Sequence, residues 1–124
     1  MYHVDITVGA NTSKYWASVQ FEDKSGTVHE RTINREIQGT INGNHLEALI
    51  EAYKLLEKPC MVTVHTESDY IIAPFQQGWI NNWEQNGWKS GKGKVVRNVE
   101  RWKRLRQAMS PHSSRFLKLE GSRE

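Results

Sequence analysis

The sequence predicts an α/β (α+β) fold in which a five-stranded mixed sheet is flanked by helices. Three β-like segments separated by turns open the chain, the hydrophobic period then changes to that of a helix, and β and helical segments alternate afterwards. A meander followed by alternating elements is typical of a mixed sheet covered by helices. Because 124 residues correspond to one domain, we expect a single domain over residues 1–124.

The first three strands are predicted by their composition and alternation. Tyr2–Val8 is rich in β-branched residues, and a turn follows at residues 9–13. Tyr15–Phe21 alternates between two faces, and residues 23–26 are a hairpin signal before a third strand, Thr27–Ile33. Because these connections are short, we expect an antiparallel meander.

An amphipathic helix is predicted after the meander. Asn44 is a favourable N-cap, and Glu47 three residues later completes a pattern that resembles a capping box. Apolar residues then recur at helical spacing up to Leu56, and Pro59 marks the end of this segment. The compact run Met61–His65 predicts a buried strand.

Three helices and one strand are expected in the remainder. Ser68 is a candidate cap for a short helix from Asp69 to about residue 75, and a second short helix covers about residues 78–86. Asn98 is a candidate cap for a longer helix, and Ser114–Leu119 is predicted as the last strand.

Composition excludes several classes of protein. The chain is 37% hydrophobic and 25% charged, which is ordinary for a globular domain. No apolar run reaches the roughly 18 residues of a membrane span, and the N-terminus does not resemble a signal peptide. A single cysteine, Cys60, excludes an internal disulfide framework and a cysteine-rich zinc site. We therefore expect a cytoplasmic protein.

Positive charge is concentrated in one segment. Residues 1–88 carry 6 Lys/Arg and 11 Asp/Glu, whereas residues 89–106 carry 8 Lys/Arg and Glu100 alone. A basic segment on an acidic body suggests a polyanionic partner. A solvated helix face would account for the same charge equally well.

Three acidic residues are candidates for a metal site. Asp5 lies within the first predicted strand, Glu47 in the first turn of the predicted helix, and Glu67 directly after the buried strand. Strand ends and a helix terminus can converge in an open sheet, and converging carboxylates repel one another unless cations lie between them. Hard oxygen ligands suit Mg²⁺ or Mn²⁺, and two such ions can act together in phosphodiester cleavage. Spacing alone is weak support, because any chain of this length has scattered acids.

A longer motif carries a family resemblance. Residues 79–105 contain W-I-x-x-W, then G-W-K, then G-K-x-V-x-N-x-x-x-W-x-x-L. This block resembles type 1 ribonuclease H, as do residues 65–71 (its T-D-S-x-Y-V) and residues 44–49 (its N-x-x-E-L helix start). The resemblance extends over residues 2 to about 119, without the family's last loop and helix, and implies a ribonuclease H-like fold.

The resemblance implies a function and a set of site residues. Asp5, Glu47 and Glu67 match the catalytic metal ligands, which implies two Mg²⁺ (or Mn²⁺) ions and hydrolysis of the RNA strand of RNA–DNA hybrids. Asn11 and Asn44 match residues that contact the hybrid.

Nucleic-acid contacts are implied elsewhere as well. Trp79 matches a family position near the DNA groove, with side-chain packing as an equal alternative. Lys89, Lys92, Lys94 and Arg97 would contact phosphates. Hybrid recognition should then depend on shape and 2′-hydroxyls, with little base readout.

Two departures from the family pattern leave an alternative open. Glu67 stands where the family has aspartate, and another register of the first strand places Val8 or Gly9 at the family's first aspartate. We prefer Asp5 on the sequence because that register also aligns Asn11. The competing hypotheses are a catalytically weak or inactive nucleic-acid-binding module on the same fold, and a scaffold domain with no nucleic-acid role.

Overall fold

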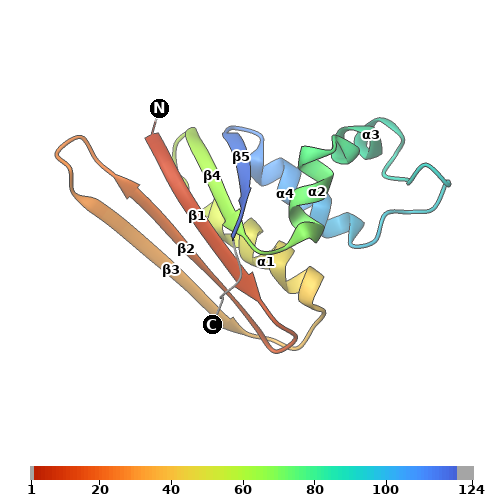
Figure 1. The fold of residues 1–124 in the computed structure, drawn as a ribbon, viewed down its shortest axis with the longest axis horizontal. Coiled ribbons are helices and arrows are strands. Elements are labelled where there is room, and N and C mark those ends of the chain that lie inside the picture. The colour runs from red at the N-terminus through yellow and green to blue at the C-terminus, as the bar shows by residue number, and fades with distance from the viewer. Residues whose placement is uncertain (1, 120–124) are drawn as a thin grey trace.

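The computed structural model describes residues 2–119, which form one sheet and four helices (Figure 1). The elements in chain order are β1 (Tyr2–Ala10), β2 (Lys14–Glu22), β3 (Val28–Glu36), α1 (Ile41–Lys54), β4 (Cys60–Thr66), α2 (Asp69–Gln76), α3 (Trp79–Gln85), α4 (Val99–Met109) and β5 (Ser113–Lys118). This order and the types of all nine elements agree with the sequence prediction.

The sheet is mixed, with strand order β3-β2-β1-β4-β5. The first three strands form the expected antiparallel meander, whereas β4 pairs in parallel with β1 and β5 in parallel with β4. The parallel pairs follow from α1 and from α2–α4, because helical crossovers return the chain in the same direction. The predicted five-stranded mixed sheet is confirmed.

The core lies between one face of the sheet and α1. Val4, Ile6 and Val8 alternate along β1 and are buried, and Leu46 and Leu49 of α1 are fully buried among the core residues. Side chains one position away along β1 point to the opposite face, because side chains alternate along a strand. In Figure 1, α1 runs behind the strands, and α2, α3 and α4 lie beyond β5. Within residues 2–119, no helix has both the length and the apolar character needed to cross a membrane.

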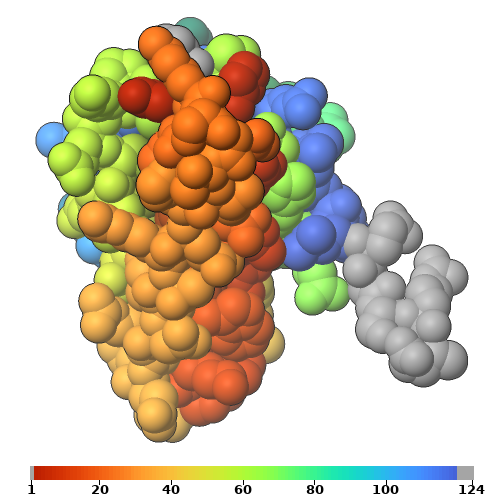
Figure 2. Space-filling model, turned by 90° about the vertical axis from the view of Figure 1, so that its left-hand side faces the viewer, coloured from red at the N-terminus to blue at the C-terminus, as the bar shows by residue number. Residues whose placement is uncertain are grey.

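The outer edge of the sheet is β3, which faces the viewer in Figure 2 together with the β2–β3 hairpin. All of its residues are exposed except Ile33, and four of them are charged: Glu30, Arg31, Arg35 and Glu36. Charged side chains on an edge strand disfavour pairing with other sheets.

The start of α1 differs from the prediction. The helix begins at Ile41, and its N-cap is Thr40, whose hydroxyl accepts a hydrogen bond from the Gly43 N–H at 2.9 Å. Asn44 lies inside the helix, so the predicted capping box of Asn44 and Glu47 was wrong. The physical reason is that Thr40 offers a side-chain acceptor four residues earlier, and glycine at 43 does not prevent helix formation there.

Candidate functional site

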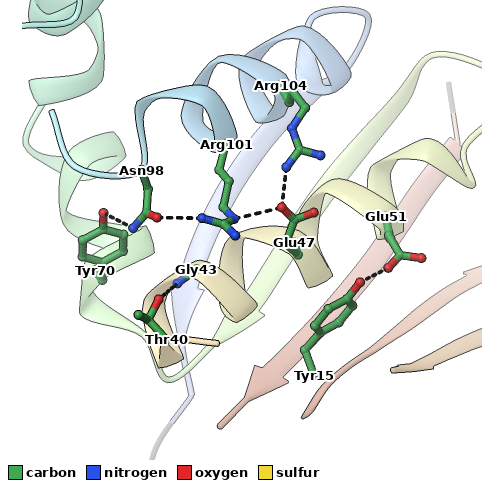
Figure 3. Close-up of polar contacts among 9 residues, drawn as sticks. All are labelled: Tyr15, Thr40, Gly43, Glu47, Glu51, Tyr70, Asn98, Arg101 and Arg104. Carbon is green, nitrogen blue, oxygen red and sulfur yellow. Dashed lines mark hydrogen bonds and ion pairs between the residues drawn. The ribbon is translucent and has the colours of Figure 1, made fainter. Parts of the chain in front are cut away.

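Glu47 lies where α1 meets α4, and it is held by two arginines. Its Oε2 accepts a hydrogen bond from Arg101 Nε at 2.9 Å, and Arg104 donates to the same oxygen through Nη2 (Figure 3). The Glu47 side chain is 21% exposed. A carboxylate expected to bind metal ions is therefore neutralised by cations of the protein itself.

Arg101 is positioned by a chain of hydrogen bonds from α2 to α4. Its Nη1 donates to Asn98 Oδ1 at 3.0 Å, and Asn98 Nδ2 donates to the Tyr70 hydroxyl at 3.0 Å (Figure 3). That hydroxyl in turn donates to the Arg97 carbonyl at 3.2 Å. Asn98 precedes α4 in the left-handed conformation, with φ of 61°, and its side chain makes no capping bond to the helix. Asn98 is therefore the N-cap residue of α4 as predicted, but its side chain orients Arg101 and bonds to no helix N–H.

A second carboxylate of α1, Glu51, is also paired. It accepts a hydrogen bond from Arg35 Nη2 at 2.9 Å. It also accepts one from the Tyr15 hydroxyl (Figure 3). The Arg35 guanidinium lowers the pKa of Glu51, while burial and the Glu51 carboxylate raise the pKa of Tyr15 to about 12. Glu51 therefore links β2, β3 and α1 as an ionised group.

Asp5 lies on the opposite face of the sheet from α1. It stands between the buried residues Val4 and Ile6, and its Oδ1 is 2.8 Å from His65 Nε2. Its partner on β4 is Thr63, four residues before Glu67, or about 13 Å along the strand. The structure therefore does not bring Asp5 to Glu47 or Glu67, and the predicted grouping of these three carboxylates is corrected.

Val8 occupies the position that Asp5 was expected to hold. Thr7 pairs with His65, so Val8 lies level with Thr66, directly before Glu67 and on the face that α1 covers. Val8 is 3% exposed and has no ligand atom to offer. The structure thus places Val8, and not Asp5, on the α1 side of the sheet beside the end of β4. The match of Val8 to the family's first aspartate stays a prediction.

Glu67 is exposed just beyond the end of β4, near the start of α1. Its charge acts on His45, which is buried in the first turns of α1 and whose Nδ1 lies 3.0 Å from the Ile41 carbonyl. Burial lowers the pKa of His45 despite Glu67, so His45 is neutral near pH 7. Among residues 2–119, no three histidines, cysteines or acids are grouped closely enough to hold a metal ion.

Asn11 and Asn44 hold the β1–β2 turn against α1. Asn11 Oδ1 accepts hydrogen bonds from the N–H groups of Ser13 and Lys14, both at 2.9 Å. Asn44 is buried, and its Nδ2 donates to the Asn11 carbonyl at 2.8 Å. In this geometry the polar groups of both side chains serve the fold, and their contact with a hybrid stays a prediction.

The basic loop, residues 89–97, projects from the end of the molecule between α3 and α4 (Figure 1). The loop forms a small hairpin. Its two sides are joined by a β-bridge between Lys89 and Val95 and by a hydrogen bond from the Ser90 N–H to the Lys94 carbonyl at 2.7 Å. Its basic side chains are exposed and form no ion pair with any acid in the described part of the chain: Lys89, Lys92, Lys94 and Arg97. Their charge is available to an external anion.

The tryptophans near this loop divide into two groups. Trp102 is fully buried, with the Trp83 ring 5.7 Å from it in an edge contact, and Trp88 is partly buried against the same core. These three tryptophans therefore pack in the core. Trp79 at the start of α3 is 47% exposed, which leaves its ring accessible.

The sequence did not predict the role of Arg101 and Arg104. A solvated helix face was one of two interpretations of the basic segment 89–106, although residues three apart share one face of a helix. That spacing was the available signal. The partner, Glu47, is 54 and 57 residues away in sequence, so no local pattern could identify it.

The fold defines the class of protein as ribonuclease H-like. The solved structure of LC9-RNase H1, described as a type 1 RNase H with the type 2 active-site motif, superposes with a TM-score of 0.79 at 20% identity, over 98% of this chain and 64% of that one. LC11-RNase H1, solved in complex with RNA/DNA hybrid, gives a TM-score of 0.59 at 18% identity, over 96% of this chain and 85% of that one.

Sequence comparison shows the family. Residues 4–122 match RNase H, and the chain belongs to this family. Ribonuclease H of Clostridium botulinum is 34% identical over 94 residues, 75% of this chain and 63% of that protein. Ribonuclease H of Thermus thermophilus is 38% identical over 94 residues, 75% of this chain and 57% of that protein. The matched part thus spans about three fifths of these two relatives.

Proposed function

We propose that this domain binds RNA–DNA hybrids and that the two-metal cleavage site of a ribonuclease H is not formed in it. One observation carries the proposal: Glu47 is paired with Arg101 and Arg104, while Asp5 faces the other side of the sheet. The domain would therefore be a catalytically weak or inactive member of its family.

The ligands present do not fit two divalent ions. Such ions need several hard oxygen ligands that converge on one point. Of the three predicted ligands, Glu47 and Glu67 remain on this side of the sheet. The β1 position level with Thr66, directly before Glu67, is occupied by the apolar Val8. An ion at Glu47 would also share the carboxylate with two guanidinium groups that already bond to its Oε2 and neutralise its charge.

Hybrid binding is supported by the basic loop. Its four cations, which have no acidic partner in the described part of the chain, can contact backbone phosphates, which supply most of the affinity of proteins for nucleic acids. The structural neighbour LC11-RNase H1 was solved with an RNA/DNA hybrid, which makes this duplex the first partner to test. Exposed Trp79 lies at the start of α3, on the chain segment that leads to the loop.

Metal-dependent hydrolysis of the RNA strand is the second candidate. It is favoured by the relatives, which are named ribonuclease H, and by the two acids that remain near the N-terminal half of α1, Glu47 and Glu67. Mg²⁺ or Mn²⁺ would supply the Lewis acid and the activated water in that case.

One experiment distinguishes the two candidates. An end-labelled RNA–DNA hybrid is incubated with the protein in Mg²⁺ and separately in Mn²⁺, and binding of the same hybrid is followed by fluorescence anisotropy in EDTA. We expect binding without cleavage. Cleavage by the parent that disappears in Glu47→Gln would establish the second candidate, and cleavage that persists in Glu47→Gln would indicate a contaminating nuclease.

A further inference from the structure

The surface where α1 meets α4 carries an excess of positive charge. Arg101 and Arg104 share a single carboxylate, Glu47, and the next acid of α1, Glu51, is already paired with Arg35. The first turn of α1 contains no acidic residue, and the N-terminus of a helix adds partial positive charge. One unit of positive charge is therefore left unpaired by the carboxylates of α1.

The two guanidinium groups have unused donors. Arg101 uses Nε for Glu47 and Nη1 for Asn98, and its Nη2 donates to no group within residues 2–119. Arg104 uses only Nη2, for Glu47. Their side chains are 40% and 45% exposed, so solvent and a large ligand can reach both.

The backbone of α1 makes room for Arg101. A Cβ atom added at Gly43 would lie 3.3 Å from Arg101 Cζ and 3.3 Å from Nη1, tighter than an ordinary contact. The guanidinium of Arg101 therefore lies against the first turn of α1, where the helix dipole also favours an anion. Two side chains and one helix terminus thus favour negative charge at the same place.

We propose that Arg101 and Arg104 form a metal-independent anchor for one phosphate of a nucleic-acid backbone, beside Glu47. The anchor rests on the proposed function, because it deepens hybrid binding by this domain. Guanidinium groups recognise phosphate oxygens through paired hydrogen bonds. A phosphodiester carries one negative charge. It would therefore balance the one positive charge of Arg101 and Arg104 that Glu47 does not neutralise.

The anchor differs in one measurable respect from a purely structural role of the arginines. If they only join α1 to α4, removing the Glu47 charge loosens the junction and does not improve binding. If they hold a phosphate, Glu47 competes with it for the same donors, so Glu47→Gln tightens hybrid binding.

The test is fluorescence anisotropy with a labelled RNA–DNA hybrid across a salt series, in EDTA and in Mg²⁺. Arg104→Gln is compared with Lys103→Gln, which removes the same charge from an exposed neighbouring position on α4. Arg104→Gln should still fold, because it removes a single half-exposed ion pair, and such pairs contribute little to stability. Thermal unfolding of each variant checks this expectation.

We expect the parent to bind in EDTA at least as tightly as in Mg²⁺. Arg104→Gln should lose one phosphate contact, so its slope of log K against log salt should be about 0.9 smaller than that of the parent. The ratio of its Kd to that of the parent should therefore be about eightfold larger at 0.1 M salt than at 1 M salt. Lys103→Gln should stay close to the parent, and Glu47→Gln should bind more tightly. A parent that binds while Arg104→Gln behaves like Lys103→Gln, or a parent that binds only in Mg²⁺, overturns the anchor and leaves hybrid binding intact. No binding by the parent overturns both.

Discussion

The basic loop allows the sharpest prediction about function. Lys92 and Lys94 are exposed at its tip and make no ion pair among the described residues. Replacing both with glutamine removes two positive charges without removing a contact that stabilises the fold. We therefore expect the free energy of unfolding to change by less than about 0.5 kcal/mol, while hybrid binding weakens.

The magnitude follows from counterion release. Each phosphate contact contributes about 0.9 to the slope of log K against log salt, so two lost contacts lower the slope by about 1.8. The ratio of the Kd of the double variant to that of the parent should therefore be about 60-fold larger at 0.1 M salt than at 1 M salt. The single variants Lys92→Gln and Lys94→Gln should each show about an eightfold effect.

The matched control is Lys24→Gln. Lys24 is exposed in the β2–β3 hairpin, at the opposite end of the molecule from the basic loop (Figure 1). Anisotropy titrations of a labelled hybrid at several salt concentrations give the slopes for all variants. If the double variant keeps the slope of the parent, or if Lys24→Gln lowers it as much as Lys92→Gln, the loop does not contact phosphate and the reasoning fails.

Three further predictions concern the carboxylates and the core. Val8→Asp places a charge at a 3% exposed position without a partner, so it should destabilise the domain by about 2–4 kcal/mol in chemical denaturation; an unchanged denaturation midpoint would mean that this position is open to solvent. Arg35 lowers the pKa of Glu51 from its usual 4.5. Ionised Glu51 therefore stabilises the fold fully above pH 4.5, and this stabilisation is lost as the pH falls through the lowered pKa. Stability measured against pH should therefore decline less between neutral and acidic pH in Glu51→Gln than in the parent, and parallel curves would contradict the assigned pair. Trp102 is fully buried and its indole N–H has no partner among the described residues. In the same assay Trp102→Ala should lower the free energy of unfolding by about 3–5 kcal/mol, and Trp102→Phe should lower it less. Equal losses would show that the aromatic ring itself contributes little.

Local signals were sufficient for the elements and their order. Alternation predicted β1 and β2, and the helical spacing of apolar residues predicted α1 and α4, because these periods depend on neighbours within a few residues. The start of α1 was less certain because both Thr40 and Asn44 can cap a helix, and only the hydrogen bond from Gly43 selects Thr40.

The register of β1 could not be decided in the same way. Asp5 and Val8 are three positions apart, an odd number, so they point to opposite faces of the sheet. A motif match around a single aspartate does not say which face α1 will cover. The burial of Val4, Ile6 and Val8 settles it, and it places Asp5 on the outer face beside His65.

By itself, the sequence determined the family resemblance, the mixed sheet and the concentration of basic residues after residue 88, since each depends on residues close together in the chain. Only the tertiary structure decided what surrounds Glu47. Arg101 and Arg104 reach it from α4 because α1 and α4 pack side by side, and that packing is set by the whole core. A carboxylate has the same letter in a sequence whether it faces metal ions or arginines, and the difference depends entirely on contacts between residues more than fifty positions apart.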